Sequence, residues 1–473
     1  MLVERYQRLQ NLAIKRMLGA FHGSPFKALE LEAALPPPAV RFERMCHAYA
    51  VRTLQFSDNH PVKRAYLDQG QSQAQDLDVI TEGLEVITHL RPNTQLLRLA
   101  LRIKELVKGE WNIEETKAEW SAPWTTFPAE FIIPQCSKNE QARKHLEMLP
   151  SIIHGPSTAI YYTDGSQGLV DGKVQNAAAL CRLGLGISKI AQAKCWNIGG
   201  GVEVADAETF AVAKALTTTL NSPSLPKELN IFVDSQAAIQ RLESCKNTYT
   251  IWKARQAARQ LSAKGTKIRI QWCPSHVNIP GNEIADRLAK QGLKANPDPE
   301  SYTSLGHLRR EVEELTRESW KKAWRDEERR EDRGQRAKGL GKLYRGISQG
   351  SLTFSLKPRP VTLTLPRRTL SAYIQLKTGK GYLKSHLERI NKAANNRCFR
   401  CSSRRRQDTK HLLLECRAYG KQRRQLRNAL YGHPLTLHML FCTTRGQKAL
   451  KTFLATTEIC TAQWMINGGQ EEA

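Results

Sequence analysis

Four acidic residues between positions 158 and 293 constrain the fold more than any other feature of the chain. Two of them, Asp164 and Asp234, end β-branched and aromatic runs that are typical of buried strands. The other two, Glu208 and Asp286, lie in helical patterns. A carboxylate beside a buried strand is costly unless a cation or a hydrogen-bond donor meets it. The four carboxylates are therefore expected to converge on one pocket and to bind hard divalent cations.

The segments around these acids resemble the type 1 ribonuclease H family. Nine residues separate His276 from Asp286, which is similar to the spacing in that family. The resemblance implies an α/β fold, a mixed five-stranded sheet with flanking helices, over residues 156–295. The alternative is that the acids are helix caps and turn formers of separate origin. The motifs that carry the resemblance occur in the family's order, at 162–166, 207–208, 233–236 and 272–286.

The same resemblance implies metal-dependent hydrolysis of the RNA strand of RNA–DNA hybrids. Asp164 would bridge two ions, Glu208 and Asp234 would complete the site nearer the leaving group, and Asp286 would complete the site that activates water. Carboxylate ligands favour Mg²⁺ or Mn²⁺ over zinc. His276 would assist proton transfer or product departure.

Two polar residues that directly follow Asp234 would contact the substrate. By the same resemblance, Ser235 and Gln236 help to hold the RNA strand. The four-acid site offers no base-edge readers, and both residues are placed for backbone and sugar contacts, so little sequence preference is expected.

The formal net charge of +27 on 473 residues indicates a polyanionic partner, most simply nucleic acid. Residues 157–293 carry 16 Lys and Arg against 10 Asp and Glu, so most of the excess lies elsewhere. No apolar run is long enough to span a membrane, and none is expected as a partner. The sequence leaves the oligomeric state open.

Residues 1–155 are expected to form a helical arm and a linker. Helical periodicity covers 4–18, 26–34 and about 39–55, whereas 109–135 has the composition of an extended linker. The helix that ends in residues 17–21 and the next helix, which ends in residues 33–37, resemble the segment that follows the reverse transcriptase domain in LINE-type retrotransposon polyproteins. An unrelated helical adaptor is the alternative. Because the chain contains no Asp-Asp pair, the mark of the polymerase, we expect it to be the C-terminal portion of such a polyprotein.

The C-terminal third is expected to comprise a charged helical linker, 296–395, and a basic knuckle with a tail, 396–473. Two cysteines lie three positions apart, a histidine follows ten positions later, and a further cysteine five positions after that. This spacing resembles the Cys-Cys-His-Cys knuckle found after ribonuclease H in some LINE-type polyproteins, and four such ligands suit structural zinc. Cysteines at chance spacing are the alternative. The expected zinc ligands are Cys398, Cys401, His411 and Cys416.

Basic residues are dense around this expected knuckle. Residues 396–428 hold 11 Lys and Arg against 2 Asp and Glu. Such a run suits phosphate contacts, although it can also be a solvated face or a nuclear address. We expect the nucleus as the location, with the cytoplasm as the alternative.

Two other functions compete with the ribonuclease H interpretation. One is a non-catalytic nucleic-acid-binding relic of a retroelement, with the knuckle and the basic residues as its working parts. The other is a DNA-cutting integrase of the same superfamily. The presence of all four acids argues against the relic, and the segments around Asp164 and His276 favour ribonuclease H over the integrase.

Overall fold

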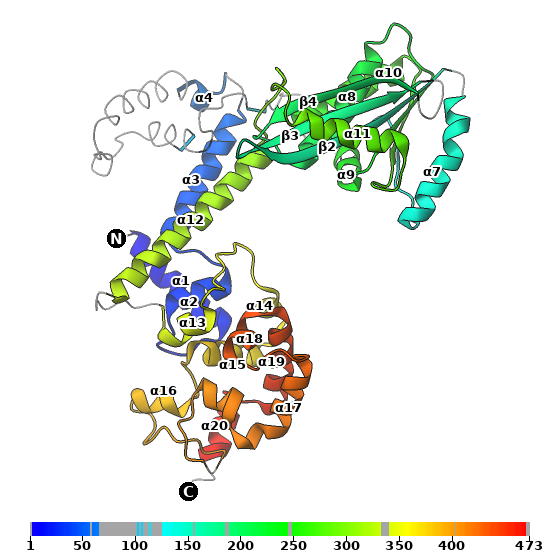
Figure 1. The fold of residues 1–473 in the computed structure, drawn as a ribbon. Coiled ribbons are helices and arrows are strands. Elements are labelled where there is room, and N and C mark those ends of the chain that lie inside the picture. Colours follow the sequence, from blue (N-terminus) through cyan, green and yellow to red (C-terminus); the bar gives the residue numbers. More distant parts are fainter. Residues whose placement is uncertain are drawn as a thin grey trace. The chain divides into compact units, whose positions relative to one another are not determined.

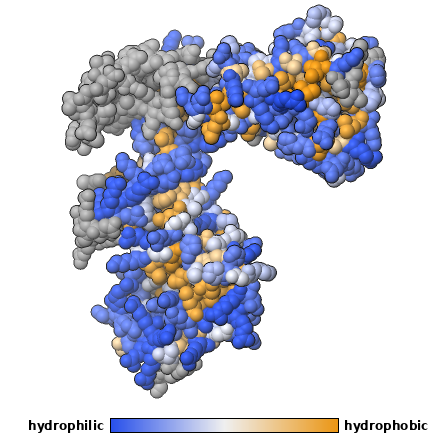
Figure 2. Space-filling model, in the orientation of Figure 1, coloured by the Kyte–Doolittle hydropathy of each residue, from blue (hydrophilic) through white to orange (hydrophobic). Residues whose placement is uncertain are grey.

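The computed structural model describes eleven stretches of the chain. The chain divides into two compact units: one is 46–312, and the other combines 1–45 with 313–473. Strands lie in unit 46–312, and the other unit consists of helices (Figure 1). No described helix is both long and apolar enough to cross a bilayer. On the face shown in Figure 2, hydrophilic residues surround smaller hydrophobic areas. The described residues are 2–56, 59–65, 102–103, 106, 113–114, 125–154, 157–184, 189–244, 248–332, 340–401 and 403–469.

A six-stranded sheet forms the centre of unit 46–312, in the order β1-β6-β5-β2-β3-β4. Strands β2, β3 and β4 are antiparallel neighbours, whereas β5, β6 and β1 run parallel to β2. Asp171 and Gly172 both have positive φ and form the tight turn between β2 and β3, as an Asp-Gly hairpin requires. The strands are β1 (Glu130–Ile132), β2 (Thr158–Val170), β3 (Lys173–Leu183), β4 (Ile190–Gly199), β5 (Glu228–Val233) and β6 (Lys267–Trp272).

Five strands, β2 to β6, lie within the expected residues 156–295, and the sheet has a sixth strand outside that range. The additional edge strand, β1, lies in the stretch expected to be an extended linker, and it pairs with β6. Only three residues form it, so the local sequence carries too little alternation to predict a strand.

Helices cover both faces of this sheet. One apolar core joins residues of α8, α9 and α10 to the sheet, and another joins residues of α7 and α11 to the opposite side chains of β2 and β5. Glu203 and Asp206 form a capping box at the start of α8. The helices are α4 (Pro61–Ala65), α7 (Lys138–Ile153), α8 (Val204–Leu220), α9 (Gln236–Glu243), α10 (Tyr249–Ala263) and α11 (Pro280–Gly292).

The other unit is helical, and its largest core joins the first two helices to the C-terminal helices. Glu32 lies fully buried in α2, where the Lys377 ammonium (2.7 Å) and the Tyr344 hydroxyl (2.6 Å) donate to it. The cysteine cluster packs into the same core, so it belongs to a helical unit. The helices here are α1 (Leu2–Leu18), α2 (Phe26–Ala33), α13 (Lys342–Ser348), α14 (Pro360–Thr364), α15 (Arg367–Thr378), α16 (Lys384–Arg389), α17 (Gly420–Ala429), α18 (Leu437–Cys442), α19 (Thr444–Thr457) and α20 (Ala462–Gly469).

Helices α3 (Pro38–Leu54) and α12 (Leu305–Asp332) contain the two boundaries between the units. Helix α3 matches the helix expected at about 39–55, and α12 lies in the expected charged helical linker. In α12, the apolar residues Leu308, Trp320 and Trp324 are all buried. The domain limits expected from the sequence stay predictions.

Candidate active site and candidate metal centre

Three of the four expected acids come together in unit 46–312. Asp164 lies on β2, Glu208 on α8, and Asp234 directly after β5. One carboxylate oxygen of each lies within 4.8 Å of the others. Asp164 and Glu208 are buried, and Asp234 is half-buried. Glu208 and Asp234, which follow Asp164 by 44 and 70 positions in the sequence, thus join it in one acidic cluster.

Gly165 explains how α8 reaches the strand. A Cβ atom at this position would lie 2.6 Å from the Glu208 backbone nitrogen and 3.0 Å from the Ala207 carbonyl carbon. The helix backbone therefore packs directly on the strand, which a larger residue would prevent. This close approach brings the Glu208 carboxylate beside Asp164.

The fourth acid belongs to a neighbouring group. Asp286, on α11, groups with Glu283 of the same helix and with His276, each offering one ligand atom within 4.8 Å of the others. Lys290 also pairs with Asp286 at 2.7 Å. His276 is exposed and has φ of 54°, so it lies on a sharply turned loop.

Burial and mutual repulsion raise the pKa values of the cluster. Burial, followed by the charges of Asp234 and Asp286, raises the pKa of Asp164 to about 7. Burial and then Asp164 raise the pKa of Glu208 well above its usual value. Burial and then Asp286 also raise the pKa of Asp234, against the opposing influence of His276. All three carboxyl groups therefore resist ionisation without a cation.

The donor set fits a divalent cation. The buried Oε2 atom of Glu208 has no hydrogen-bond partner among the described residues. Such an atom is costly to bury unless something satisfies it. Clustered carboxylate oxygens are the ligands that Mg²⁺ and Mn²⁺ prefer. The residues that would hold ions here are Asp164, Glu208, Asp234 and Asp286.

Asn282 and Glu283 are site residues that the sequence did not single out. The Asn282 side chain hydrogen-bonds to Asp234 and lowers the pKa of that carboxyl. It is buried at the start of α11, 48 positions from Asp234. Glu283 lies beside it and joins the group of Asp286. The sequence could have indicated them, because they follow Pro280-Gly281 at the helix start and lie three to four positions, about one helical turn, before Asp286.

The two expected substrate contacts follow Asp234 at the edge of the cluster. Ser235 is the N-cap of α9, where its hydroxyl accepts a hydrogen bond from the Ala238 N–H at 3.2 Å. The hydroxyl hydrogen remains available to donate. Gln236 is exposed at the first position of the helix. Both positions are therefore compatible with a contact from outside.

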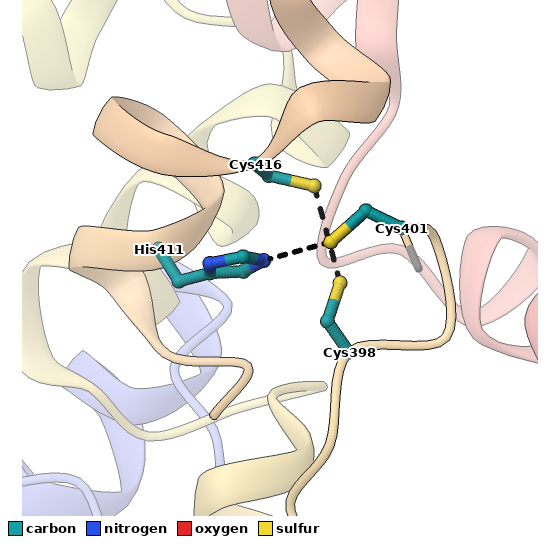
Figure 3. A group of neighbouring side chains, drawn as sticks. All are labelled: Cys398, Cys401, His411 and Cys416. Atoms are coloured by element: carbon teal, nitrogen blue, oxygen red, sulfur yellow. Dashed lines mark hydrogen bonds between the residues drawn. The ribbon is translucent and has the colours of Figure 1, made fainter. Parts of the chain in front are cut away.

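A second candidate metal centre lies in the helical unit (Figure 3). Cys398, Cys401, His411 and Cys416 each offer one ligand atom within 4.8 Å of the others. A short hairpin supports the first two, since the Cys398 N–H donates to the Arg405 carbonyl at 2.8 Å. His411 begins a π-helical turn, and Cys416 ends it.

The geometry of this cluster fits tetrahedral zinc. The Sγ atoms of Cys398 and Cys416 lie 3.9 Å apart, and Cys401 Sγ lies 3.4 Å from His411 Nε2 (Figure 3). Zinc–sulfur bonds of about 2.3 Å imply about 3.8 Å between two sulfur ligands. The hydrogen bond shared with Cys416 lowers the pKa of Cys398 to about 4, which favours a thiolate at that position.

Comparison with known proteins relates the segment that carries the first site to a known family. The family model described as RNase H matches residues 156–294. No curated protein matches the chain. Two solved structures that match are RNase H1 from the halophilic archaeon Halobacterium salinarum NRC-1 and the N-terminal RNase H domain of Rv2228c from Mycobacterium tuberculosis, solved as a fusion with maltose binding protein.

The two solved structures match the same share of the chain. The Halobacterium protein is 22% identical, with 29% of this chain and 97% of that one covered, and a TM-score of 0.23. The Mycobacterium domain is 17% identical, with 29% and 99% covered, and a TM-score of 0.23. The match of the family model confirms the ribonuclease H resemblance expected from the sequence. Residues 156–294 therefore form an RNase H domain, the domain of the ribonuclease H enzymes.

Proposed function

We propose that the protein is an endonuclease that uses two Mg²⁺ or Mn²⁺ ions to hydrolyse the RNA strand of RNA–DNA hybrids. One observation carries the proposal: three carboxylates with raised pKa values lie within 4.8 Å of one another inside an RNase H domain. Structural acids are normally paired with a cationic side chain or hydrogen-bonded. A buried, partnerless carboxylate oxygen on Glu208 is better explained by a bound ion.

Each acid has a distinct role in this proposal. Bound divalent ions would stabilise charge on the attacking and leaving oxygens of the phosphodiester. Asp164, at the centre of the cluster, would contact both ions, with Glu208 and Asp234 at one and Asp286 at the other. Asn282 orients the Asp234 carboxylate through its hydrogen bond.

Proton transfer is the proposed role of His276. It is exposed and lies beside Asp286, so it can exchange protons with solvent and still reach the site. The alternative within the same proposal is that it helps the product to leave.

Substrate recognition would depend on shape and on the 2′-hydroxyl groups. Ser235 can donate through its free hydroxyl hydrogen, and Gln236 is exposed beside it. Both suit backbone and sugar contacts. Because only the RNA strand carries 2′-hydroxyl groups, the hybrid would be cut in that strand alone.

The helical unit would anchor nucleic acid. Arg404, Arg405 and Arg406 are exposed beside the candidate zinc centre, where zinc would hold the hairpin that carries them. We also propose a role in a LINE-type retroelement protein and the nucleus as its place of action, on the sequence resemblance and the basic residues alone. A non-catalytic nucleic-acid-binding relic is the second candidate, and the same basic residues favour it.

A substrate panel with the full chain tests the proposal. The substrates are an RNA–DNA hybrid, duplex RNA and duplex DNA, each labelled on either strand and incubated with Mg²⁺ or with EDTA. We expect cleavage of the RNA strand of the hybrid alone, and only with Mg²⁺. Binding without cleavage would favour the relic, and cleavage of a DNA strand would favour an integrase.

A further inference from the structure

Helix α7 precedes the segment matched by the family model, yet it contacts the strand that carries Asp164. The Nε2 atom of His145, on α7, lies 2.7 Å from the Tyr162 hydroxyl. Both side chains are 0% exposed. Burial lowers the pKa of His145 to about 4, so the imidazole is neutral near pH 7. The contact is therefore a hydrogen bond between two neutral, fully buried groups.

His145 also touches the neighbouring strand. Its ring meets the Phe232 ring edge-on, with centroids 4.5 Å apart, and Phe232 stacks on Tyr162 at 5.1 Å. Tyr162 lies two residues before Asp164, and Phe232 lies two residues before Asp234. One histidine thus holds the aromatic side chains that precede two acids of the cluster.

Tyr162 in turn supports the start of α11. A Cβ atom at Gly281 would lie 2.2 Å from the Tyr162 ring, so the ring rests directly on the helix backbone. The next residue is Asn282, which hydrogen-bonds to Asp234. Asp286 follows on the same helix. A shift of the Tyr162 ring would therefore move Asn282 and Asp286 together with α11, and it would disturb Asp234 through its hydrogen bond with Asn282.

We infer that His145 is a positioning residue, which acts through Tyr162 to fix the spacing of the acid cluster and hence its affinity for divalent ions. This inference rests on the proposed function. The competing explanation is that His145 only fills the core between α7 and the sheet. Losing a buried hydrogen bond costs about 0.5–1.5 kcal/mol, which corresponds to roughly a two- to tenfold change in affinity if it acts on the site.

A cavity beside His145 makes a chemical-rescue experiment possible. Its volume is about 310 Å³, and it is bounded by residues of the β1–α7 connection, of α7 and of β6. Truncation of His145 to Ala would enlarge this cavity by the space of one imidazole ring.

The experiment is a double-mutant cycle in the full chain, with Mn²⁺ affinity measured by calorimetric titration without substrate. His145→Ala and Tyr162→Phe should each weaken Mn²⁺ binding by about two- to tenfold, and the double variant should be no weaker than either. Leu149→Ala, in the buried face of the same helix, is the control for lost packing. It should lower the unfolding temperature in EDTA and leave Mn²⁺ affinity within about twofold of the parent.

Added imidazole should restore Mn²⁺ affinity to His145→Ala and should not restore it to Tyr162→Phe. His145→Gln, which keeps a polar group near Nε2, replaces His145→Ala if that variant does not fold. Equal loss of Mn²⁺ affinity in Leu149→Ala, or additive effects of the two polar substitutions, would overturn the inference. Absence of hybrid cleavage by the parent would instead overturn the proposed function, because the titration requires no cleavage.

Discussion

At the scale of single residues, the three clustered carboxylates lower the stability of the metal-free fold. Asp164 and Glu208 are buried close to each other and to Asp234, and each carboxylate raises the cost of ionising another. Lys290 forms an ion pair with Asp286, whereas among the described residues no ion pair joins a cation to the other three acids. Divalent ions would remove this repulsion, so the site should be least stable when it is ionised and empty.

The stability of the metal-free RNase H domain should therefore fall as the pH rises from about 4 to about 7. The folded pKa of Asp164 is about 7 and its usual value is 3.8, so the folded state binds a proton that the unfolded state releases in this window. Asp164 therefore changes the free energy of unfolding by at most about 4 kcal/mol across this window. Calorimetry in EDTA should show this fall in the parent and a smaller fall in Asp164→Asn. Equal pH dependence in both proteins would contradict the pKa assignment.

At the scale of elements, the sequence predicted those whose pattern is local. The four acids could be found because each follows or lies within a strong strand or helix pattern. Strand β1 and the contact of α7 could not be found, since β1 pairs with residues about 139 positions away. The hydrogen bonds of His145 and Asn282 likewise depend on tertiary packing. Helices α13 and α14, within the expected linker 296–395, were not located individually, because their apolar residues are too few to show a helical period.

The hairpin and the π-helical turn that carry the cysteine cluster should depend on zinc. The purified full chain should contain one equivalent of Zn²⁺, and Cys398→Ser or Cys416→Ser should lose it and lower the stability of the helical unit. Both thiols are buried, as is that of Cys460, which packs in the same core and lies outside the cluster. Cys460→Ser is therefore the matched control, and it should keep the metal. Zinc content can be measured by elemental mass spectrometry. A zinc-free protein with full stability would exclude a structural zinc centre.

At the scale of the whole molecule, catalysis and affinity are assigned to different units. The RNase H domain carries a modest positive charge, while residues 396–428 carry 11 of the chain's 72 Lys and Arg residues. Deletion of the C-terminal helices would expose a core that they share with α1 and α2. Charge substitutions on the surface are the cleaner way to separate binding from folding.

Replacing Arg404, Arg405 and Arg406 by Gln should weaken hybrid binding and flatten its salt dependence. Each lost phosphate contact reduces the slope of log K against log salt by about 0.9, so the change is at most about 2.7. The control replaces Lys322, Arg325 and Arg329 of α12, which removes the same charge elsewhere. Titrations across a salt series should show a larger effect at 404–406. Equal slopes in the two variants would exclude a specific role for these arginines.

Asp164→Asn tests directly whether the buried carboxylates form a metal-dependent nuclease site. Cleavage of a labelled RNA–DNA hybrid by the full chain is measured with Mg²⁺ for the parent, for Asp164→Asn and for Asp171→Asn. Asp171 is exposed in the β2–β3 turn, where Asn suits the positive φ, so this control should cleave at the parent rate. Asp164→Asn should cleave at least about a thousandfold more slowly, since a metal ligand supplies several kcal/mol. Cleavage by Asp164→Asn at the parent rate would show that these carboxylates do not form the nuclease site.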